Sequence, residues 1–273
     1  MSSADPIIFY DIASAEPLRT FAPNPWKTRL ALNLKGVPYT TQWTDMPKIE
    51  ALRKDLGVPA NRTLPDGSEY HTLPLIQDKA NAQFIGDSFE IALYLDKTYP
   101  QKPTLIVPGT TGLTAAFNSQ VDGIFTKFVG LADQMPFDPR CQEEVSAMFA
   151  KRMNVESLED VKMSEDARTA MLLGFEAALG ELAKAYRHTG GTTDYIWRTT
   201  GTASQSAQRG KVEAEVGPWL DGDRPVYADL IVGAWLKMME ASMRPLEWEQ
   251  IRKWQNGLWA RVVDALADLS VIV

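Results

Sequence analysis

Residues 21–36 read FAPNPWKTRLALNLKG, a loop that turns abruptly into a helix. Apolar residues recur through this stretch at helical spacing, at Trp26, Leu30, Ala31 and Leu34. Gly36, followed shortly by Pro38, supplies a stop signal. Asn24 is a favoured N-cap, and Pro25 suits the first position of a helix. We therefore expect the helix to begin at Pro25.

The residues on either side of this helix predict alternating strands and helices. The apolar run at 6–10 and the β-branched and aromatic run at 39–44 are typical of strands. Residues 47–56 predict a second helix, and the two apolar runs within 73–85 predict a hairpin. A third helix starts at Asp87. The order βαβαββα fits within about 100 residues, the usual size of one domain.

The second half of the chain carries almost no strand signal. The spacing of its apolar residues predicts helices at 114–132, 143–153, 167–187, 229–243 and 248–269. Residues 100–112, rich in Pro and Gly, are typical of a linker, and residues 58–71 predict a long surface loop. The fold class is therefore α+β, with a first domain at 1–104 and an all-helical domain at 110–273.

Composition excludes several classes of partner. The 273 residues include 28 Lys+Arg and 35 Asp+Glu, and the net charge of -7 would repel nucleic acid and anionic membrane surfaces. The single cysteine, Cys141, rules out an internal disulfide and a cysteine-based zinc site. No stretch approaches the roughly 20 apolar residues of a membrane span, and the first residues do not resemble a signal peptide. We therefore expect a cytoplasmic protein.

The only histidines are His71 and His188. Neither has Cys, Asp or Glu at the spacing of metal ligands, so no metal site is expected. His71 ends the 58–71 loop, where a solvated side chain is expected.

The start of the 21–36 helix is suited to binding an anion. The positive end of the helix dipole and its unpaired amides would stabilise a thiolate. Because proline has no N–H, the donors left are the amides of Asn24 and Trp26 and the Asn24 side chain. An ordinary capped helix would have the same sequence.

Two further segments have signals of their own. Pro74 opens a strand, where a cis bond would leave the backbone of Leu73 facing outward to pair with an extended peptide. A trans proline at the start of an edge strand is the alternative. Asp87 and Glu90 resemble a capping box, but Asp87 could also hold an ammonium group while Ser88 and the helix amides hold a carboxylate.

In this order and spacing, the three clusters resemble the glutathione transferases, a family with a thioredoxin-like βαβαββα domain followed by an all-α domain. The resemblance implies glutathione as cosubstrate, bound through Ala22, Trp26, Leu73, Pro74, Asp87 and Ser88. It also implies a homodimer. The runs FYDIAS and APNPWKTRLALNLKG are similar to the fungal etherase-related class, whose relatives include bacterial enzymes that cleave β-aryl ethers.

This chain departs from the family at two positions. Ala22 stands where relatives have a catalytic serine or cysteine, so no side-chain hydroxyl or thiol is available there and Asn24 becomes the candidate catalytic residue. We therefore expect low activity. Val226 stands where the family's capping motif has Ser or Thr, which leaves Asp229 to hold the loop.

The resemblance implies that the protein acts on hydrophobic, aromatic electrophiles by conjugation or by glutathione-dependent ether cleavage, in detoxification. Phe21 and Trp26 are the candidates for an aromatic substrate wall. The alternative is a ligandin, a carrier of aromatic compounds with little catalysis, which the alanine at position 22 favours. His71 could reach the glycyl carboxylate of glutathione.

Overall fold

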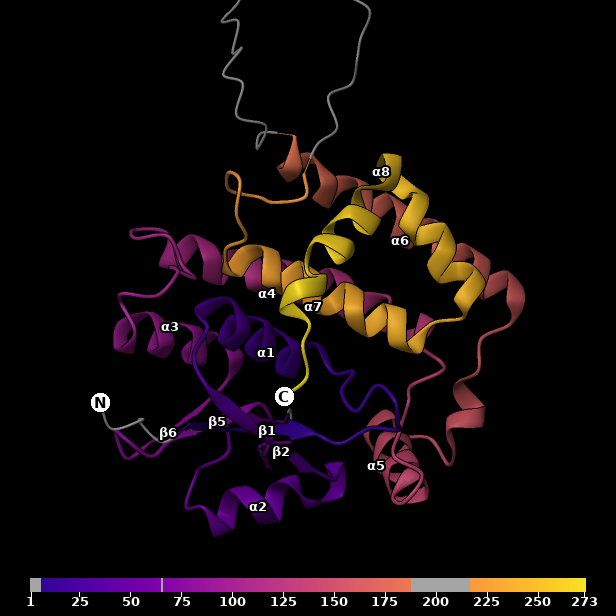
Figure 1. The fold of residues 1–273 in the computed structure, drawn as a ribbon. Helices are drawn as coiled ribbons and strands as arrows, with labels where there is room; N and C mark the ends of the chain where they lie inside the picture. The colour runs from indigo at the N-terminus through magenta and orange to yellow at the C-terminus, as the bar shows by residue number, and fades with distance from the viewer. Residues whose placement is uncertain (1–5, 65, 188–216) are drawn as a thin grey trace, which may run out of the picture.

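The computed structural model describes residues 6–64, 66–187 and 217–273 (Figure 1). Its first half is built on a four-stranded sheet in the order β2-β1-β5-β6. The strands are β1 (Ile7–Ile12), β2 (Tyr39–Thr44), β5 (Leu75–Asp78) and β6 (Gln83–Gly86). β1 is parallel to β2, whereas β1 with β5 and β5 with β6 are antiparallel. Strands joined in parallel need a crossover connection, and the 21–36 helix supplies it.

Helices cover both faces of the sheet. α1 (Pro23–Lys35) and α3 (Ser88–Thr98) lie on the face toward the second half of the chain, and α2 (Ile49–Asp55) lies on the other face (Figure 1). The βαβαββα order is confirmed. The 58–71 loop is less irregular than expected, because it contains a small hairpin of β3 (Arg62–Thr63) and β4 (Glu69–Tyr70).

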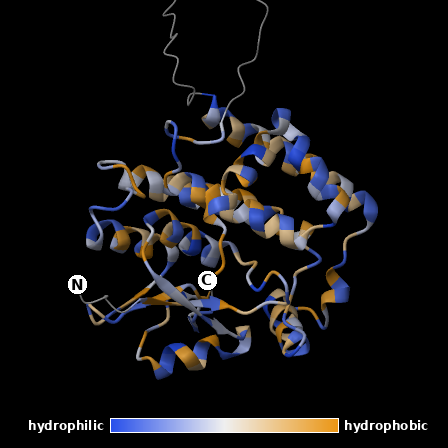
Figure 2. Ribbon diagram, viewed as in Figure 1, coloured by the Kyte–Doolittle hydropathy of each residue, from blue (hydrophilic) through white to orange (hydrophobic). Residues whose placement is uncertain are grey.

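The second half is helical, as expected. Its α-helices are α4 (Thr111–Lys127), α5 (Gln142–Met153), α6 (Glu165–Tyr186), α7 (Tyr227–Ser242) and α8 (Pro245–Ala265). The 3₁₀ turns are η1 (Met46–Lys48) in the first half, and η2 (Val129–Leu131), η3 (Leu158–Val161) and η4 (Ala267–Leu269) in the second. α8 is kinked at Trp254–Gly257, where the backbone leaves helical geometry. Figure 2 shows hydrophilic and hydrophobic residues alternating along the outer helices α2, α5 and α6.

The two halves share one hydrophobic core. α7 is buried along most of its length and packs against α1, so the central helix of the second half contacts the crossover helix of the sheet. Leu30 of α1, Leu95 of α3 and Leu230 of α7 belong to the same buried cluster. The C-terminal residues return to the first half, where the Asn33 side chain donates to the carbonyl oxygens of Leu269 and Val271.

A charge pair with a fully buried lysine lies at the contact between the halves. The ammonium of Lys27, on α1, donates to Asp122 Oδ1 at 2.6 Å and to Asn118 Oδ1 at 2.9 Å, both on α4. The indole N–H of Trp235, on α7, donates to the same Asp122 oxygen at 2.6 Å. Burial lowers the pKa of Lys27, and the Asp122 charge opposes that shift. Since a buried ammonium needs a partner, this cluster ties α1, α4 and α7 together.

No helix within the three described ranges has both the length and the apolar character needed to cross a membrane.

The start of α7 is held by a buried carboxylate. Asp229 accepts hydrogen bonds from the Leu220 amide at 2.7 Å and the Val226 amide at 2.8 Å. Burial raises the pKa of Asp229 to about 7, and the two amides oppose that shift. Val226 is the N-cap residue and has no polar side-chain atom, so the cap consists of Asp229 alone.

Val226→Thr restores the hydroxyl that an N-cap normally supplies, at an extended backbone position. We expect this change to raise the free energy of unfolding by about 1 kcal/mol, because the hydroxyl can accept from a first-turn amide. Urea unfolding followed by circular dichroism measures it. Val226→Ala is the control, since it removes the methyl groups without adding an oxygen, and should destabilise. A threonine variant no more stable than wild type would contradict the prediction.

Candidate functional site

The start of α1 differs from the expectation by two residues. Ala22 is the N-cap, with an extended backbone at φ -66° and ψ 139°, and the helix begins at Pro23 rather than Pro25. A residue before proline avoids helical geometry, and proline suits the first helical position, so the Ala22–Pro23 pair takes the role expected of Asn24 and Pro25. Asn24 therefore lies inside the first turn.

This shift changes which amides are free. The Trp26 N–H donates to the Ala22 carbonyl at 3.1 Å and closes the first turn, so it is not available to an anion, contrary to the expectation. Pro23 and Pro25 have no N–H. The Asn24 amide is thus the free donor of the first turn, and its half-buried side chain has no hydrogen-bond partner among the described residues.

Phe21 and Trp26 do not form the open aromatic wall that the sequence suggested. Phe21 is 4% exposed and packs edge-on against Phe137, with ring centroids 6.1 Å apart. Trp26 is 5% exposed, and the Lys237 ammonium lies 4.8 Å from the centroid of its ring. Both side chains are covered because the second half of the chain folds over the start of α1.

An aromatic series that sequence reasoning missed continues outward from Phe21. Phe137 stacks on Phe149 of α5 at 5.5 Å. The Arg152 guanidinium lies 5.2 Å from the Phe149 ring centroid and 4.7 Å from that of Tyr70. These side chains come from segments far apart in the chain, so no periodicity could have signalled them. They connect the start of α1 to the loop before Leu73.

The Leu73–Pro74 peptide bond is cis. The Leu73 side chain is 3% exposed, and the β5 strand begins only at Leu75. The Leu73 N–H and C=O have no hydrogen-bond partner in the part of the chain that the structure describes. Thr72 is anchored by Asn61, whose side-chain oxygen accepts from the Thr72 amide at 3.0 Å. The loop is therefore held in place while the Leu73 backbone groups stay unpaired within the described residues.

Asp87 is the N-cap of α3 and has a left-handed φ of 72°. Its Oδ1 accepts from the Phe89 amide at 2.8 Å and the Glu90 amide at 3.4 Å, whereas its Oδ2 has no such partner among the described residues. Glu90 does not complete the capping box. Ser88 opens the helix and is almost fully buried.

Strand register brings these segments together. Leu75 pairs with Gly86 across β5 and β6, so Leu73 and Pro74 come to the same edge of the sheet as Asp87 and Ser88. Tyr10 of β1 also pairs with Leu75, which brings the end of β1, and the loop leading into α1, to that edge. The structure therefore places the three sequence clusters around one edge.

A buried tyrosine from the second half of the chain lies beneath Ser88. Tyr227, at the start of α7, is fully buried, and its ring packs edge-on against Phe89 at 5.8 Å. Burial raises the pKa of Tyr227, and the nearby Ser88 hydroxyl opposes that shift, although the two hydroxyls do not form a hydrogen bond of normal geometry.

His71 is not a solvated loop residue. It is 8% exposed, and both ring nitrogens are buried without a hydrogen-bond partner among the described residues. The nearest acid is Glu69, with Oε2 3.6 Å from His71 Nε2. His188 lies outside the described residues. No group of three or more His, Cys, Asp or Glu side chains in residues 6–64, 66–187 and 217–273 is placed to hold a metal ion.

Known protein families match both halves of the chain. The model described as glutathione S-transferase, N-terminal domain, matches residues 21–98, and the model described as glutathione S-transferase, C-terminal domain, matches residues 114–269. Among curated proteins, the glutathione S-transferase-like protein ustS of Aspergillus flavus is 28% identical over 261 residues, which cover 92% of this chain and 86% of that protein.

Two solved fungal structures align along nearly the whole chain. The glutathione S-transferase CsGST63524 of Ceriporiopsis subvermispora, in complex with glutathione, matches with a TM-score of 0.82 and 29% identity, over 98% of this chain and 99% of that chain. Glutathione transferase GSTFuA3 from Phanerochaete chrysosporium matches with a TM-score of 0.80 and 29% identity, over 99% and 100% of the two chains. This chain therefore belongs to the glutathione S-transferase family, beside its fungal FuA-type members.

Proposed function

We propose that the protein binds glutathione at the sheet edge formed by Leu73, Asp87 and the start of α1, and transfers it to hydrophobic aromatic electrophiles. The observation that carries the proposal is the unpaired backbone of Leu73, which lies at the same strand end as a helix start with a free carboxylate oxygen. An extended peptide with an amino-acid terminus needs both features. The first domain, 1–104, would bind glutathione, and the helical domain, 110–273, would cover the electrophile.

The γ-glutamyl end is assigned to the Asp87–Ser88 turn. Because Asp87 Oδ1 accepts both capping amides, its Oδ2 is left to pair with the α-ammonium of the ligand. The Ser88 hydroxyl and the Ser88 amide at the start of α3 suit the neighbouring carboxylate. The cysteinyl backbone would pair with Leu73 beside Pro74. The buried, unpaired nitrogens of His71, two residues before Leu73, support the assignment of His71 to the glycyl carboxylate.

The sulfur is assigned to the start of α1. The helix dipole and the Asn24 amide and side chain would stabilise the thiolate, which attacks the electrophile while the leaving group departs. Ala22 offers only a methyl group. Removing one donor to a developing charge lowers turnover by roughly 10²–10³-fold, so weak conjugation or ether cleavage is the expected activity.

A ligandin function is the second candidate. The observation in its favour is that the start of α1 retains one free amide and no side-chain hydroxyl at position 22. A site that binds glutathione without activating it strongly would suit a carrier of aromatic compounds. In either role the protein would act in detoxification. We place it in the reducing cytoplasm, because the chain has a single thiol, Cys141, and can form no internal disulfide.

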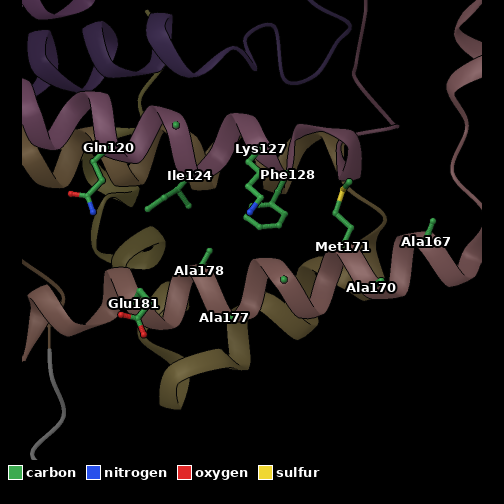
Figure 3. Close-up of a pocket in the computed structure, with 12 residues that line it drawn as sticks. Gln120, Ile124, Lys127, Phe128, Ala167, Ala170, Met171, Ala177, Ala178 and Glu181 are labelled. Carbon is green, nitrogen blue, oxygen red and sulfur yellow. The ribbon is translucent and has the colours of Figure 1, made fainter.

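A homodimer is proposed through the groove between α4 and α6. The groove has a volume of about 910 Å³, and Figure 3 shows Ile124 of α4 and Phe128, just after its end, facing the small residues of α6. Lys127 and Glu181 stand on its opposite walls. A second copy related by a two-fold axis would place Lys127 of each copy opposite Glu181 of the other, as a self-complementary interface requires.

Asp87→Asn tests the glutathione site, because asparagine keeps the capping oxygen and tolerates the left-handed backbone but removes the charge. We expect glutathione affinity to fall about tenfold or more, with an unchanged melting temperature. Isothermal titration calorimetry measures the affinity. Glu90→Gln, an exposed acid on the same helix, is the control and should bind normally. A wild-type protein that does not bind glutathione would refute the proposed function.

Ala22→Ser separates the enzyme from the carrier. With an aromatic halide as substrate, the variant should turn over roughly 10²-fold faster, since serine adds a donor to the thiolate. Aromatic-ligand affinity, measured by fluorescence displacement, should stay fixed. Asn24→Ala, which removes the side-chain donor and keeps the backbone amide, should lower the residual wild-type activity further. If both proteins conjugate the halide and wild type does so as fast as the serine variant, activation does not need the hydroxyl and the carrier hypothesis fails.

Ala178→Arg tests the dimer, because it places a bulky charge against the groove. Light scattering after gel filtration should report the mass of a monomer for this variant and of a dimer for wild type. Leu246→Arg, which replaces an exposed leucine at the start of α8, should remain dimeric. A monomeric wild type at micromolar concentration would contradict the proposal.

A further inference from the structure

Arg53, on α2, is buried beneath the proposed glutathione site. Its side chain is 2% exposed. Its Nη1 donates to the Thr72 carbonyl at 3.0 Å, and its Nη2 donates to the Pro59 carbonyl at 2.5 Å. Its Nε is buried and has no hydrogen-bond partner among the described residues. Thr72 precedes Leu73, so the guanidinium holds the loop whose backbone is proposed to pair with glutathione.

The same guanidinium touches the second loop of the site. A Cβ atom added to Gly86 would lie 3.0 Å from Arg53 Nη1 and 3.2 Å from Nη2, closer than ordinary contact. Gly86 immediately precedes Asp87 and Ser88. Arg53 therefore lies between the two loops, and a glycine at position 86 leaves the space that the guanidinium fills.

The charge of Arg53 has no acidic partner. No carboxylate in the described part of the chain forms an ion pair with it, and burial lowers its pKa with no acid acting in the opposite direction. Two other buried arginines show the usual arrangement, since Arg29 pairs with Asp11 at 2.7 Å and Arg168 with Glu247 at 2.6 Å. A guanidinium stays charged in proteins, so Arg53 leaves a net positive charge under the site.

We propose that Arg53 is a positioning residue for glutathione, and that its uncompensated charge is balanced by the bound tripeptide. Glutathione carries more carboxylates than ammonium groups. An anionic ligand at Leu73, Asp87 and Ser88 would therefore supply the negative charge that no carboxylate of the described protein places beside Arg53. The hydrogen bonds of the guanidinium to the Pro59 and Thr72 carbonyls hold both ends of the segment that leads to Leu73. This inference rests on the proposed glutathione site.

The test compares glutathione with its diethyl ester, in which both carboxylates are neutral, by calorimetric titration. For Arg53→Gln we expect affinity for glutathione to fall about tenfold or more, and affinity for the ester to change less than about twofold. Arg53→Lys keeps the positive charge but lacks the planar guanidinium. It should recover most of the glutathione affinity that Arg53→Gln loses. Lys54→Gln is the matched control, because it removes an exposed charge next along α2 and should bind normally.

Gly86→Ala adds a test that keeps the arginine. The methyl group displaces the guanidinium, so this variant should weaken glutathione binding in wild type but not in the Arg53→Gln background. If Arg53→Gln does not fold, Arg53→Lys and Gly86→Ala decide the question. Equal losses for glutathione and ester would show a structural role alone and overturn the charge proposal, as would unchanged binding. Failure of wild type to bind glutathione would instead refute the proposed function.

Discussion

The buried ammonium of Lys27 fixes how the two halves of the molecule meet. Its carboxylate partner, Asp122, also accepts from Trp235, so one cluster joins α1, α4 and α7. The Lys27 side chain is fully buried, so removing Asp122 would leave its charge in the core without an acidic partner and would destabilise the fold. With α1 held in this way, its first turn lies at the sheet edge where the Leu73 loop and the Asp87 turn also end.

Two buried cations therefore lie on opposite sides of the sheet. Lys27 is on the face toward the second half and has an acid partner, whereas Arg53 is on the other face and donates to backbone carbonyls. Asp87 also favours the charged form of Lys27. Arg53 thus differs from Lys27 in having no acidic partner among the described residues, which suits an anionic tripeptide at the proposed glutathione site.

The departures at positions 22 and 226 have different consequences. At position 226 the missing hydroxyl is offset by Asp229, which accepts two amides at the start of α7. At position 22 the Trp26 amide closes the helix and the flanking prolines have no N–H, so Asn24 is the donor left near the missing hydroxyl.

The sequence by itself determined the βαβαββα order, the helical second half and the start of a helix at Asp87, because these follow from patterns within a few residues. Local signals also misplaced the start of α1. Ala22–Pro23 and Asn24–Pro25 both resemble a helix start, and only tertiary packing determines which of the two begins the helix. Tertiary structure alone decided that Phe21 and His71 are buried and that Arg53 lies between two loops. Those outcomes depend on strand register and on contacts between segments far apart in the chain, which no local pattern records.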